Sequence, residues 1–224
     1  MVKELKRGAA VGTTFNRGLE IYKKNFVPLL LATLLAFVIG GVSCGICLAP
    51  LLCGVFAMIL AAMRNNDAVL KTGDVFKGFQ KFLPAFVACL VIGAINSILY
   101  SILVVIPILG WIALIVVCYA VTPAVFAWSQ LLITDQNASI GDAILVPLKL
   151  VGDKRFWSVI LVSFVAGLLG SVGAVACGIG VFVTIPFAYC MIAAAYEEAY
   201  SESAPAAPET PAVEAPAADN PSVA

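Results

Sequence analysis

Three long stretches of the sequence, 25–63, 82–134 and 156–196, contain no charged residue. The hydrocarbon core of a bilayer is about 30 Å thick, and a helix needs roughly 20 apolar residues to cross it. Each stretch is therefore long enough for one crossing, a tight turn and a crossing back. All 13 lysines and arginines lie outside these stretches. The pattern predicts three helical hairpins in a membrane.

The composition favours a membrane environment over water. Hydrophobic residues make up 62% of the chain and charged residues 12%, and the mean hydropathy is +1.05. A soluble domain carries roughly a quarter of charged residues, and its core needs a polar shell that the uncharged stretches do not supply. A transmembrane barrel would alternate apolar and polar positions, whereas 28–42 is apolar almost throughout. Helices are therefore the expected way of crossing the membrane.

The sequence predicts an all-α integral membrane bundle of six transmembrane helices, arranged as three hairpins. The first stretch barely holds two crossings, so five spans or a re-entrant first hairpin is the alternative. The membrane domain (26–200) follows a basic amphipathic segment (1–25) and precedes an acidic Ala/Pro-rich tail (201–224), which lacks the apolar surface to fold alone. The predicted spans are 27–43, 46–63, 83–106, 111–133, 157–175 and 178–196.

The positions of the basic residues predict an orientation. Lysine and arginine concentrate in the cytoplasmic loops of membrane proteins. The predicted outer turns at 40–46, 107–111 and 170–178 contain neither residue. We therefore expect the N-terminus in the cytoplasm, and six crossings return the C-terminal tail to the same side.

A short segment with regularly spaced apolar residues precedes each hairpin and ends in basic and aromatic residues. The apolar positions recur at helical spacing in 15–26 and 140–151, and every third residue in 76–82. Such segments suit amphipathic interfacial helices, with aromatic rings at the acyl boundary and lysines near anionic headgroups. The alternative is that they only anchor the loops between hairpins. The candidate lipid-interface residues are Lys23, Lys24, Phe26, Phe76, Lys77, Phe79, Lys81, Phe82, Lys154, Arg155 and Trp157.

Local signals refine these helices. Ser139, with Asp142 three residues later, approximates a capping box, so the third amphipathic helix is expected to begin there. Pro147 is expected to bend or shorten it. Pro123 and Pro186 are expected to kink the fourth and sixth spans.

The chain is poor in groups that do chemistry. It contains no histidine, and no Asp, Glu, Lys or Arg lies in a predicted span. Proton relays and ion-coupling sites in membranes use ionisable side chains, so a proton-coupled transporter is disfavoured. A glycine-rich phosphate loop, a histidine-containing triad and a zinc ligand set are missing from the sequence. We therefore expect no enzymatic activity, no cofactor, no metal and no nucleic-acid partner.

Two polar features of the predicted hairpins remain. Asn96 lies in the middle of the third span, where an interhelical hydrogen bond is the expected role and a polar site on a substrate path is the alternative. Cys44 and Cys47 have CxxC spacing at the first outer turn. Packing as small hydrophobic residues is the expected role of the seven cysteines, with redox chemistry or metal binding as the alternative. Whether these two form a disulfide stays open.

One order of motifs suggests a family. Lys24-Asn25-Phe26 is followed by Pro50 and a small-residue helix ending at Arg64, then by Asp74-Val-Phe-Lys-Gly-Phe79, a long central hairpin, Asp142-Ala and Lys154-Arg-Phe-Trp157. This order resembles bacterial polytopic membrane proteins related to the membrane domain of glycerophosphoryl diester phosphodiesterases, over about residues 10–198. The resemblance implies a six-span helical bundle in the bacterial cytoplasmic membrane. In some relatives a soluble phosphodiesterase domain is fused to the bundle, but its residues are not among the 224 here, so no catalytic residue is carried over.

Three hypotheses of function follow from the sequence. The first is a non-enzymatic membrane protein whose amphipathic helices interact with membrane lipids, or with a protein partner on the cytoplasmic face, in membrane organisation. The alternative is a uniporter or channel for a small neutral or lipid-like solute, with Asn96 on its path. The third is a membrane subunit of a separately encoded enzyme.

Overall fold

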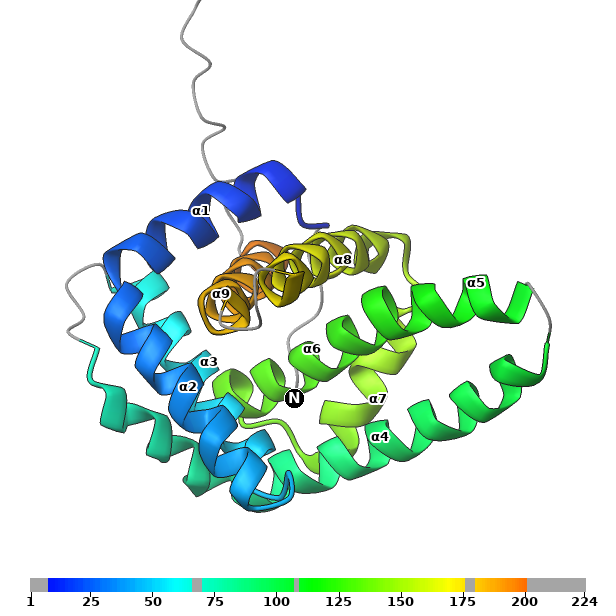
Figure 1. Cartoon of the computed structure of the whole chain (residues 1–224), viewed down its shortest axis with the longest axis horizontal. Coiled ribbons are helices and arrows are strands. Elements are labelled where there is room, and N and C mark those ends of the chain that lie inside the picture. Colours follow the sequence, from blue (N-terminus) through cyan, green and yellow to red (C-terminus); the bar gives the residue numbers. More distant parts are fainter. Residues whose placement is uncertain (1–7, 66–69, 107–108, 176–179, 201–224) are drawn as a thin grey trace, which may run out of the picture.

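The computed structural model describes residues 8–65, 70–106, 109–175 and 180–200. Every regular element in these ranges is helical, which confirms the prediction of an all-α protein (Figure 1). The tail 201–224 and the first seven residues lie outside the described residues, as do parts of the predicted second and third outer turns. The elements are α1 (Val11–Lys24), α2 (Phe26–Val42), α3 (Leu48–Arg64), η1 (Thr72–Lys81), α4 (Phe82–Val105), α5 (Leu109–Val116), η2 (Val117–Val121), α6 (Thr122–Gln136), α7 (Ile140–Leu150), α8 (Lys154–Val175) and α9 (Gly180–Tyr200).

Six helical segments begin and end within a few residues of the predicted spans: α2, α3, α4, the run α5–η2–α6, α8 and α9. The first hairpin turns where the chain adopts two left-handed residues, Cys44 (φ 51°) and Gly45 (φ 87°). The Gly45 amide donates to the Gly40 carbonyl at 2.7 Å, a Schellman-type end that satisfies a free carbonyl of α2. The tight return of the first hairpin therefore follows from its glycines.

The described helices differ in how well they suit a membrane. Two are long and apolar enough to cross one, namely Thr72–Val105, which joins η1 to α4, and α9. The pair α1 and α2 would make a third, but it is bent by 93°. α3 has 17 residues, a length of about 26 Å at 1.5 Å per residue, which is shorter than the hydrocarbon core. The described structure is thus compatible with a membrane protein, and the number of crossings stays a prediction.

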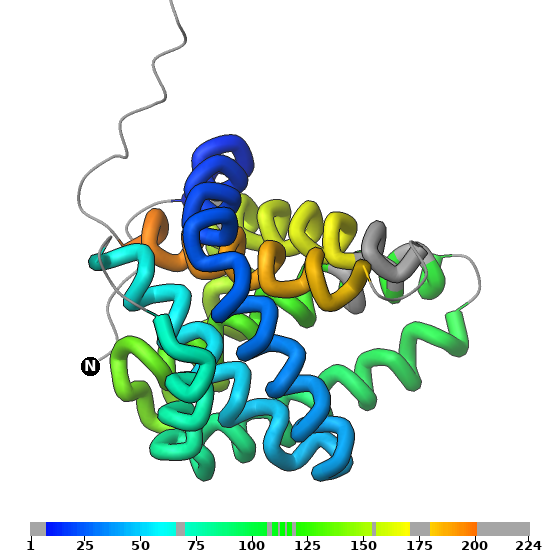
Figure 2. Tube along the Cα trace, turned by 60° about the vertical axis from the view of Figure 1, so that its left-hand side comes forward, coloured from blue at the N-terminus to red at the C-terminus, as the bar shows by residue number. Residues whose placement is uncertain are grey.

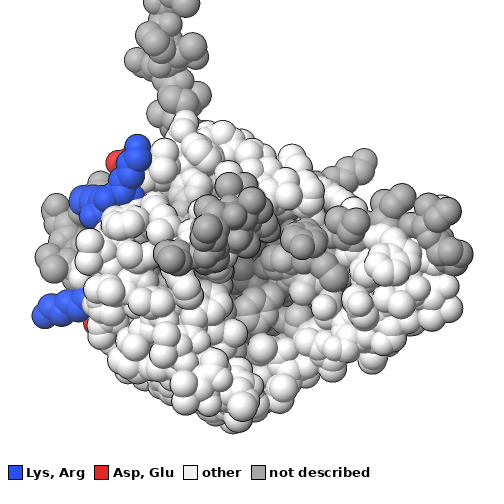
Figure 3. Space-filling view, viewed as in Figure 1, with Lys and Arg blue, Asp and Glu red and all other residues white. Residues whose placement is uncertain are grey.

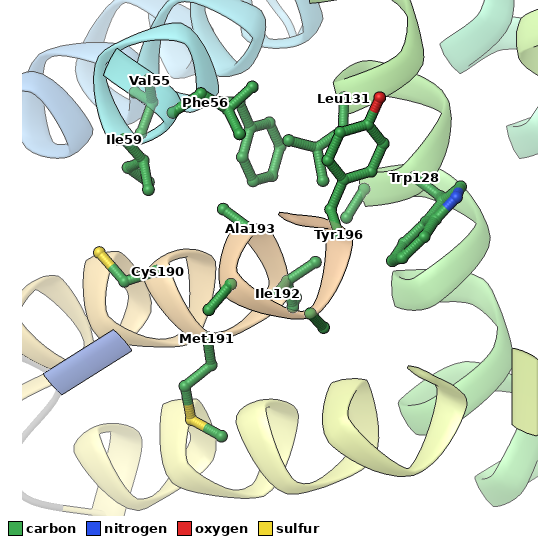
Figure 4. Close-up of a cluster of buried hydrophobic side chains, with 14 of the residues drawn as sticks. Val55, Phe56, Ile59, Trp128, Leu131, Cys190, Met191, Ile192, Ala193 and Tyr196 are labelled. Atoms are coloured by element: carbon green, nitrogen blue, oxygen red, sulfur yellow. The ribbon is translucent and has the colours of Figure 1, made fainter. Parts of the chain in front are cut away.

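α3 is the central helix of the fold. Almost every residue from Ala49 to Met63 is buried, because α3 packs against α2, η1, α6 and α9. Figure 4 shows Phe56 of α3, Leu131 of α6 and Tyr196 of α9 meeting in this core. Trp128 is fully buried beside them, with its ring edge-to-face on Tyr196 at 5.2 Å between centroids.

α1 runs antiparallel along α9 (Figures 1 and 2). At one end Thr13 donates to the Glu198 carboxylate at 2.9 Å, and at the other the Tyr22 hydroxyl donates to the Val183 carbonyl at 2.6 Å. Between them Gly18 is so close to α9 that a Cβ there would lie 3.0 Å from the Met191 amide nitrogen. The apolar face of α1, expected at the lipid boundary, therefore contacts protein instead.

η1 is a 3-10 helix that packs against the first half of α3 through glycines. A Cβ on Gly78 would lie 1.9 Å from the Pro50 carbonyl oxygen, and one on Gly54 would lie 1.9 Å from the Val75 carbonyl oxygen. Only glycine permits this approach at both positions. A 3-10 helix has three residues per turn, so side chains three apart lie directly above one another.

Two prolines in helices have different outcomes. In a regular α-helix the ring of Pro123 would clash with the carbonyl group four residues earlier. Proline also has no amide hydrogen to donate to that carbonyl. The chain answers with the π-helical segment η2, in which the Thr122 amide donates to the Val117 carbonyl. In α7, Ser139 caps the first turn by accepting from the Asp142 amide at 3.2 Å, as predicted. The helix continues past the buried Pro147, so this proline does not shorten it.

Candidate lipid interface

Four phenylalanines form a stacked row along η1 and the start of α4. We call Phe76, Phe79, Phe82 and Phe86 the aromatic ladder. Successive ring centroids are 6.2, 6.1 and 5.7 Å apart, and the planes of neighbouring rings differ by 22° or less. The three-residue period of η1 explains the row, and Phe76 at its end is 45% exposed. The ladder therefore exposes the ring of Phe76 at its end, whereas Phe79, Phe82 and Phe86 are half-buried.

Lysines lie along the same short helix. Lys71 and Lys77 are exposed and Lys81 is half-buried. The Lys77 ammonium lies 2.7 Å from the Asp74 carboxylate, and this hydrogen bond lowers the pKa of Asp74. The Lys71 amide also donates to Asp74, at 3.3 Å, which fixes the first turn of η1. Aromatic and basic residues thus occur on the same short segment, a combination that suits contact with lipid headgroups.

The ladder leads directly into a helix with large apolar side chains on its surface. Leu83, Leu90, Ile98, Ile102 and Val105 of α4 are between 55% and 79% exposed. The α4–α5 hairpin projects from the rest of the molecule in Figure 2. An exposed apolar surface of this extent is unfavourable in water and is typical of contact with a membrane or a partner.

The remaining candidates from the sequence lie at other places. Lys23 and Lys24 are exposed in the last turn of α1, and Phe26 at the start of α2 is 37% exposed. Trp157, near the start of α8, is 53% exposed. Lys154 and Arg155 form the first turn of α8, and their side chains lie outside the described part of the structure.

The structure does not bring the three basic-aromatic segments together at one end. The end of α1 lies beside Val183, in the first turn of α9. Gly78, three residues before Lys81, lies against the first half of α3. The start of α8 lies near the opposite end of α9, because Phe156 contacts Trp128, which contacts Tyr196. Figure 3 shows basic side chains at one edge of the displayed face and a broad uncharged area beside it.

Sequence reasoning missed a cluster of ion pairs that joins three helix ends. We call Arg64, Asp135 and Glu197 the three-helix clasp. The Arg64 guanidinium binds Asp135 through Nη1, and it binds Glu197 through Nε at 2.7 Å and Nη2 at 2.6 Å. A signal was present in the sequence, because each of the three is the first charged residue after one of the uncharged stretches.

The clasp gathers the C-terminal ends of α3, α6 and α9. Helix C-termini carry partial negative charge. The Arg64 cation offsets both this charge and the charges of the two carboxylates. The hydrogen bond to Asp135 is the main reason why the pKa of Arg64 is raised further above its usual value, so this residue stays charged. Tyr196 donates to Asp135 at 3.2 Å and accepts from Gln136 at 2.8 Å, which links the clasp to the core.

Asn96 makes the interhelical hydrogen bond that the sequence predicts. Its Oδ1 accepts from the hydroxyl of Thr122 at 2.7 Å and so joins α4 to α6. The cavity beside it has a volume of about 70 Å³, with Ile92, Leu99 and Val125 among its lining residues. This is room for little more than one or two water molecules.

Five cysteines whose side chains are described, at positions 44, 47, 53, 89 and 190, are free thiols. Cys44 is exposed and Cys47 half-buried at the first turn, while Cys53 and Cys190 are buried in the core. Cys177 lies outside the described residues. Within the described ranges, no group of three or more His, Cys, Asp or Glu side chains could hold a metal ion.

The geometry thus defines one extended surface, the aromatic ladder with its lysines and α4, and one structural cluster, the three-helix clasp. Comparison with protein-family models, with curated proteins and with solved structures finds no match to this chain.

Proposed function

We propose that this chain is a non-enzymatic integral membrane protein that binds membrane lipids through the aromatic ladder and the lysines beside it. The observation that carries the proposal is the stacked row from Phe76 to Phe86, which is exposed at Phe76, half-buried at the other three rings, and followed by the exposed apolar side chains of α4. The resemblance to the membrane domain of glycerophosphoryl diester phosphodiesterases is part of the same proposal.

The physical basis of the proposal is that the aromatic rings and the lysines of this segment contact different parts of the lipid. Aromatic rings are favourable at the boundary between headgroups and acyl chains, and each lysine near an anionic surface contributes about 1 kcal/mol. Stacking on η1 holds the rings in place before lipid arrives, which reduces the entropy lost on binding. A protein partner on the cytoplasmic face would use the same surface. Lipid binding explains better why this surface continues into the exposed apolar side chains of α4.

The arrangement in the membrane is proposed as six crossings in three hairpins, with both termini in the cytoplasm of a bacterial cell. The three-helix clasp supports this, because it holds the ends of the three returning helices α3, α6 and α9 together. The contact of η1 with the first half of α3 argues against it, because it places Gly78 near the end of α3 opposite Arg64. Single cysteines at positions 44 and 77 of a cysteine-free variant test it in intact cells. An impermeant thiol reagent should label position 44 and spare position 77, and the reverse pattern would invert the orientation.

The test of lipid binding compares two triple variants of the ladder. Phe76, Phe79 and Phe82 are replaced together by Ser in one and by Leu in the other, which keeps apolar area but removes the rings. We expect the Ser variant to lose most co-purifying phosphatidylglycerol in native mass spectrometry, and the Leu variant to keep an intermediate share. Equal lipid retention by wild type and the Ser variant would overturn the proposal.

Transport remains the alternative from the sequence, with less support from the described residues. Asn96 is engaged with Thr122, and the cavity beside it is small. Flux of small neutral solutes into proteoliposomes, compared between wild type and Asn96→Leu, separates the two functions. Co-purification of a soluble hydrolase would instead favour the third hypothesis, a membrane subunit of a separate enzyme.

A further inference from the structure

A cavity lies between α6, α8 and α9, away from the aromatic ladder. It has a volume of about 340 Å³, within the range of about 300–1,000 Å³ for small-molecule sites. Ala166 and Gly170 of α8 lie on one side of it, and Val181 and Ile192 of α9 on the other. No charged residue lines it.

The cavity exists because small residues of α8 face α9 next to an irregular helix. The lining residues of α8 recur at helical spacing and include a serine, an alanine and two glycines. A Cβ built on Gly170 would meet no atom within 4 Å, so open space begins there. Pro123, directly after the π-helical segment η2, closes the third side.

One polar group in the lining has no partner. Ser163 is 1% exposed, and no described residue makes a hydrogen bond to its hydroxyl. A buried hydroxyl without a hydrogen bond costs about 1–3 kcal/mol. Because Ser163 is among the lining residues, a rotation of its side chain toward an occupant's hydrogen-bond acceptor would remove this cost.

The dimensions select the kind of occupant. From Val181 to Ile192 the lining of α9 extends about 16 Å, at 1.5 Å per residue. This equals half of the roughly 30 Å hydrocarbon core, the depth filled by the acyl chains of one leaflet. An uncharged lining suits an acyl chain, and Ser163, at one end of the α8 lining, can meet the single ester carbonyl at the start of that chain.

We propose that this cavity holds one acyl chain of a membrane phospholipid, with the Ser163 hydroxyl donating to an ester carbonyl. The inference rests on the proposed lipid function and adds a second, chain-specific site to it. The aromatic ladder contacts lipid at the surface, whereas the cavity retains a single chain between α8 and α9.

Photolabelling of the full chain tests the proposal. The protein is reconstituted in vesicles of phosphatidylethanolamine and phosphatidylglycerol that include phosphatidylglycerol with a diazirine on one acyl chain. After illumination, labelled peptides are mapped by mass spectrometry. We expect labelling at Tyr189 and Ile192, two cavity residues of α9, above that of the lipid-exposed Leu90 on α4.

Two variants and a matched control show whether the labelled lipid occupies the cavity. Gly170→Leu fills the cavity and should abolish labelling at Tyr189. Gly93→Leu makes the same change on α4, where a Cβ also meets no atom within 4 Å, and should leave it unchanged. Ser163→Ala should reduce labelling by about threefold to tenfold, which corresponds to the free energy of one hydrogen bond. It should not lower thermal stability in lipid-free detergent.

The results separate this inference from the function on which it rests. Labelling at Tyr189 no higher than at Leu90, or equal in wild type and Gly170→Leu, overturns the inference even where the Ser ladder variant loses lipid. Cavity labelling that Gly170→Leu removes, combined with full lipid retention by the Ser ladder variant, upholds the cavity and overturns the ladder.

Discussion

The guanidinium of Arg64 binds the carboxylate of Glu197 across 133 positions of sequence, with 2.7 Å between Nε and Oε1. The same side chain binds Asp135, so one cation holds the ends of α3, α6 and α9. The Arg64 side chain is 50% exposed, whereas those of Asp135 and Glu197 are 12% and 17% exposed. Loss of the cation would leave two largely covered carboxylates close together.

We therefore predict that Arg64→Met lowers the stability of the protein. The exposure of Arg64 limits the loss to about 1 kcal/mol, which corresponds to a fall in melting temperature of about 2–4 °C. Intrinsic fluorescence in detergent measures it, because the buried Trp128 contacts Tyr196 of the clasp region. Lys23→Met, which removes an exposed charge from α1, is the control and should leave the melting temperature unchanged. Equal melting of all three proteins would show that the clasp does not stabilise the fold.

The contact between η1 and α3 predicts a strong effect of a single methyl group. In Gly78→Ala the new Cβ would meet the Pro50 carbonyl oxygen at 1.9 Å, and neither group is at the end of a flexible side chain. The helix η1 must then separate from α3, and the aromatic ladder moves with it. We expect a lower melting temperature and weaker lipid retention.

Gly73→Ala is the matched control for this contact, since it lies in the same 3-10 helix and its Cβ meets nothing within 4 Å. It should retain both stability and lipid. If Gly78→Ala behaves as Gly73→Ala does, η1 is not seated on α3 as described.

The helical segments could be predicted from the sequence because charge is excluded from hydrocarbon. The limits of the uncharged stretches predicted the start of α4 and the end of α9 within a few residues. The Ser139 cap and the Asn96 hydrogen bond were also predicted, since a polar side chain in a helix start or a span has few available roles.

The close packing of one helix on another was not predicted, because it depends on glycines whose role is visible only in three dimensions. Gly18, Gly54 and Gly78 permit close approaches that no periodicity reveals. The spacing of Phe76, Phe79 and Phe82 did carry a signal, since a period of three is that of a 3-10 helix. The clasp could also have been predicted, because each of its three residues is the first charged residue after an uncharged stretch.

The hydrogen bond between Thr122 and Asn96 predicts a measurable coupling between α4 and α6. Thr122→Val and Asn96→Leu should each destabilise the protein, and the double variant should lose less than their sum. Interhelical hydrogen bonds of this kind in membranes average about 0.6 kcal/mol. Unfolding of the four proteins in a double-mutant cycle measures the coupling. Strict additivity would show that the two side chains do not interact.

The packing of α1 on α9 predicts opposite effects of one substitution at two positions of the same helix. Alanine is favoured over glycine in a helix interior by about 0.5–1 kcal/mol, chiefly through backbone entropy. Gly12→Ala should gain part of this stability, because Gly12 lies in the first turn of α1 and its Cβ meets nothing within 4 Å.

Gly18→Ala should instead lose stability, because its Cβ would lie 3.0 Å from the Met191 amide nitrogen and 3.1 Å from the Met191 Cα, both backbone atoms of α9. Helix α1 would have to move away, and the 2.6 Å hydrogen bond from Tyr22 to Val183 would weaken with it. An interfacial α1 without contact to α9 would gain stability from both substitutions. Melting temperatures of the two variants in the same detergent therefore decide whether the first amphipathic helix lies on α9 or on lipid.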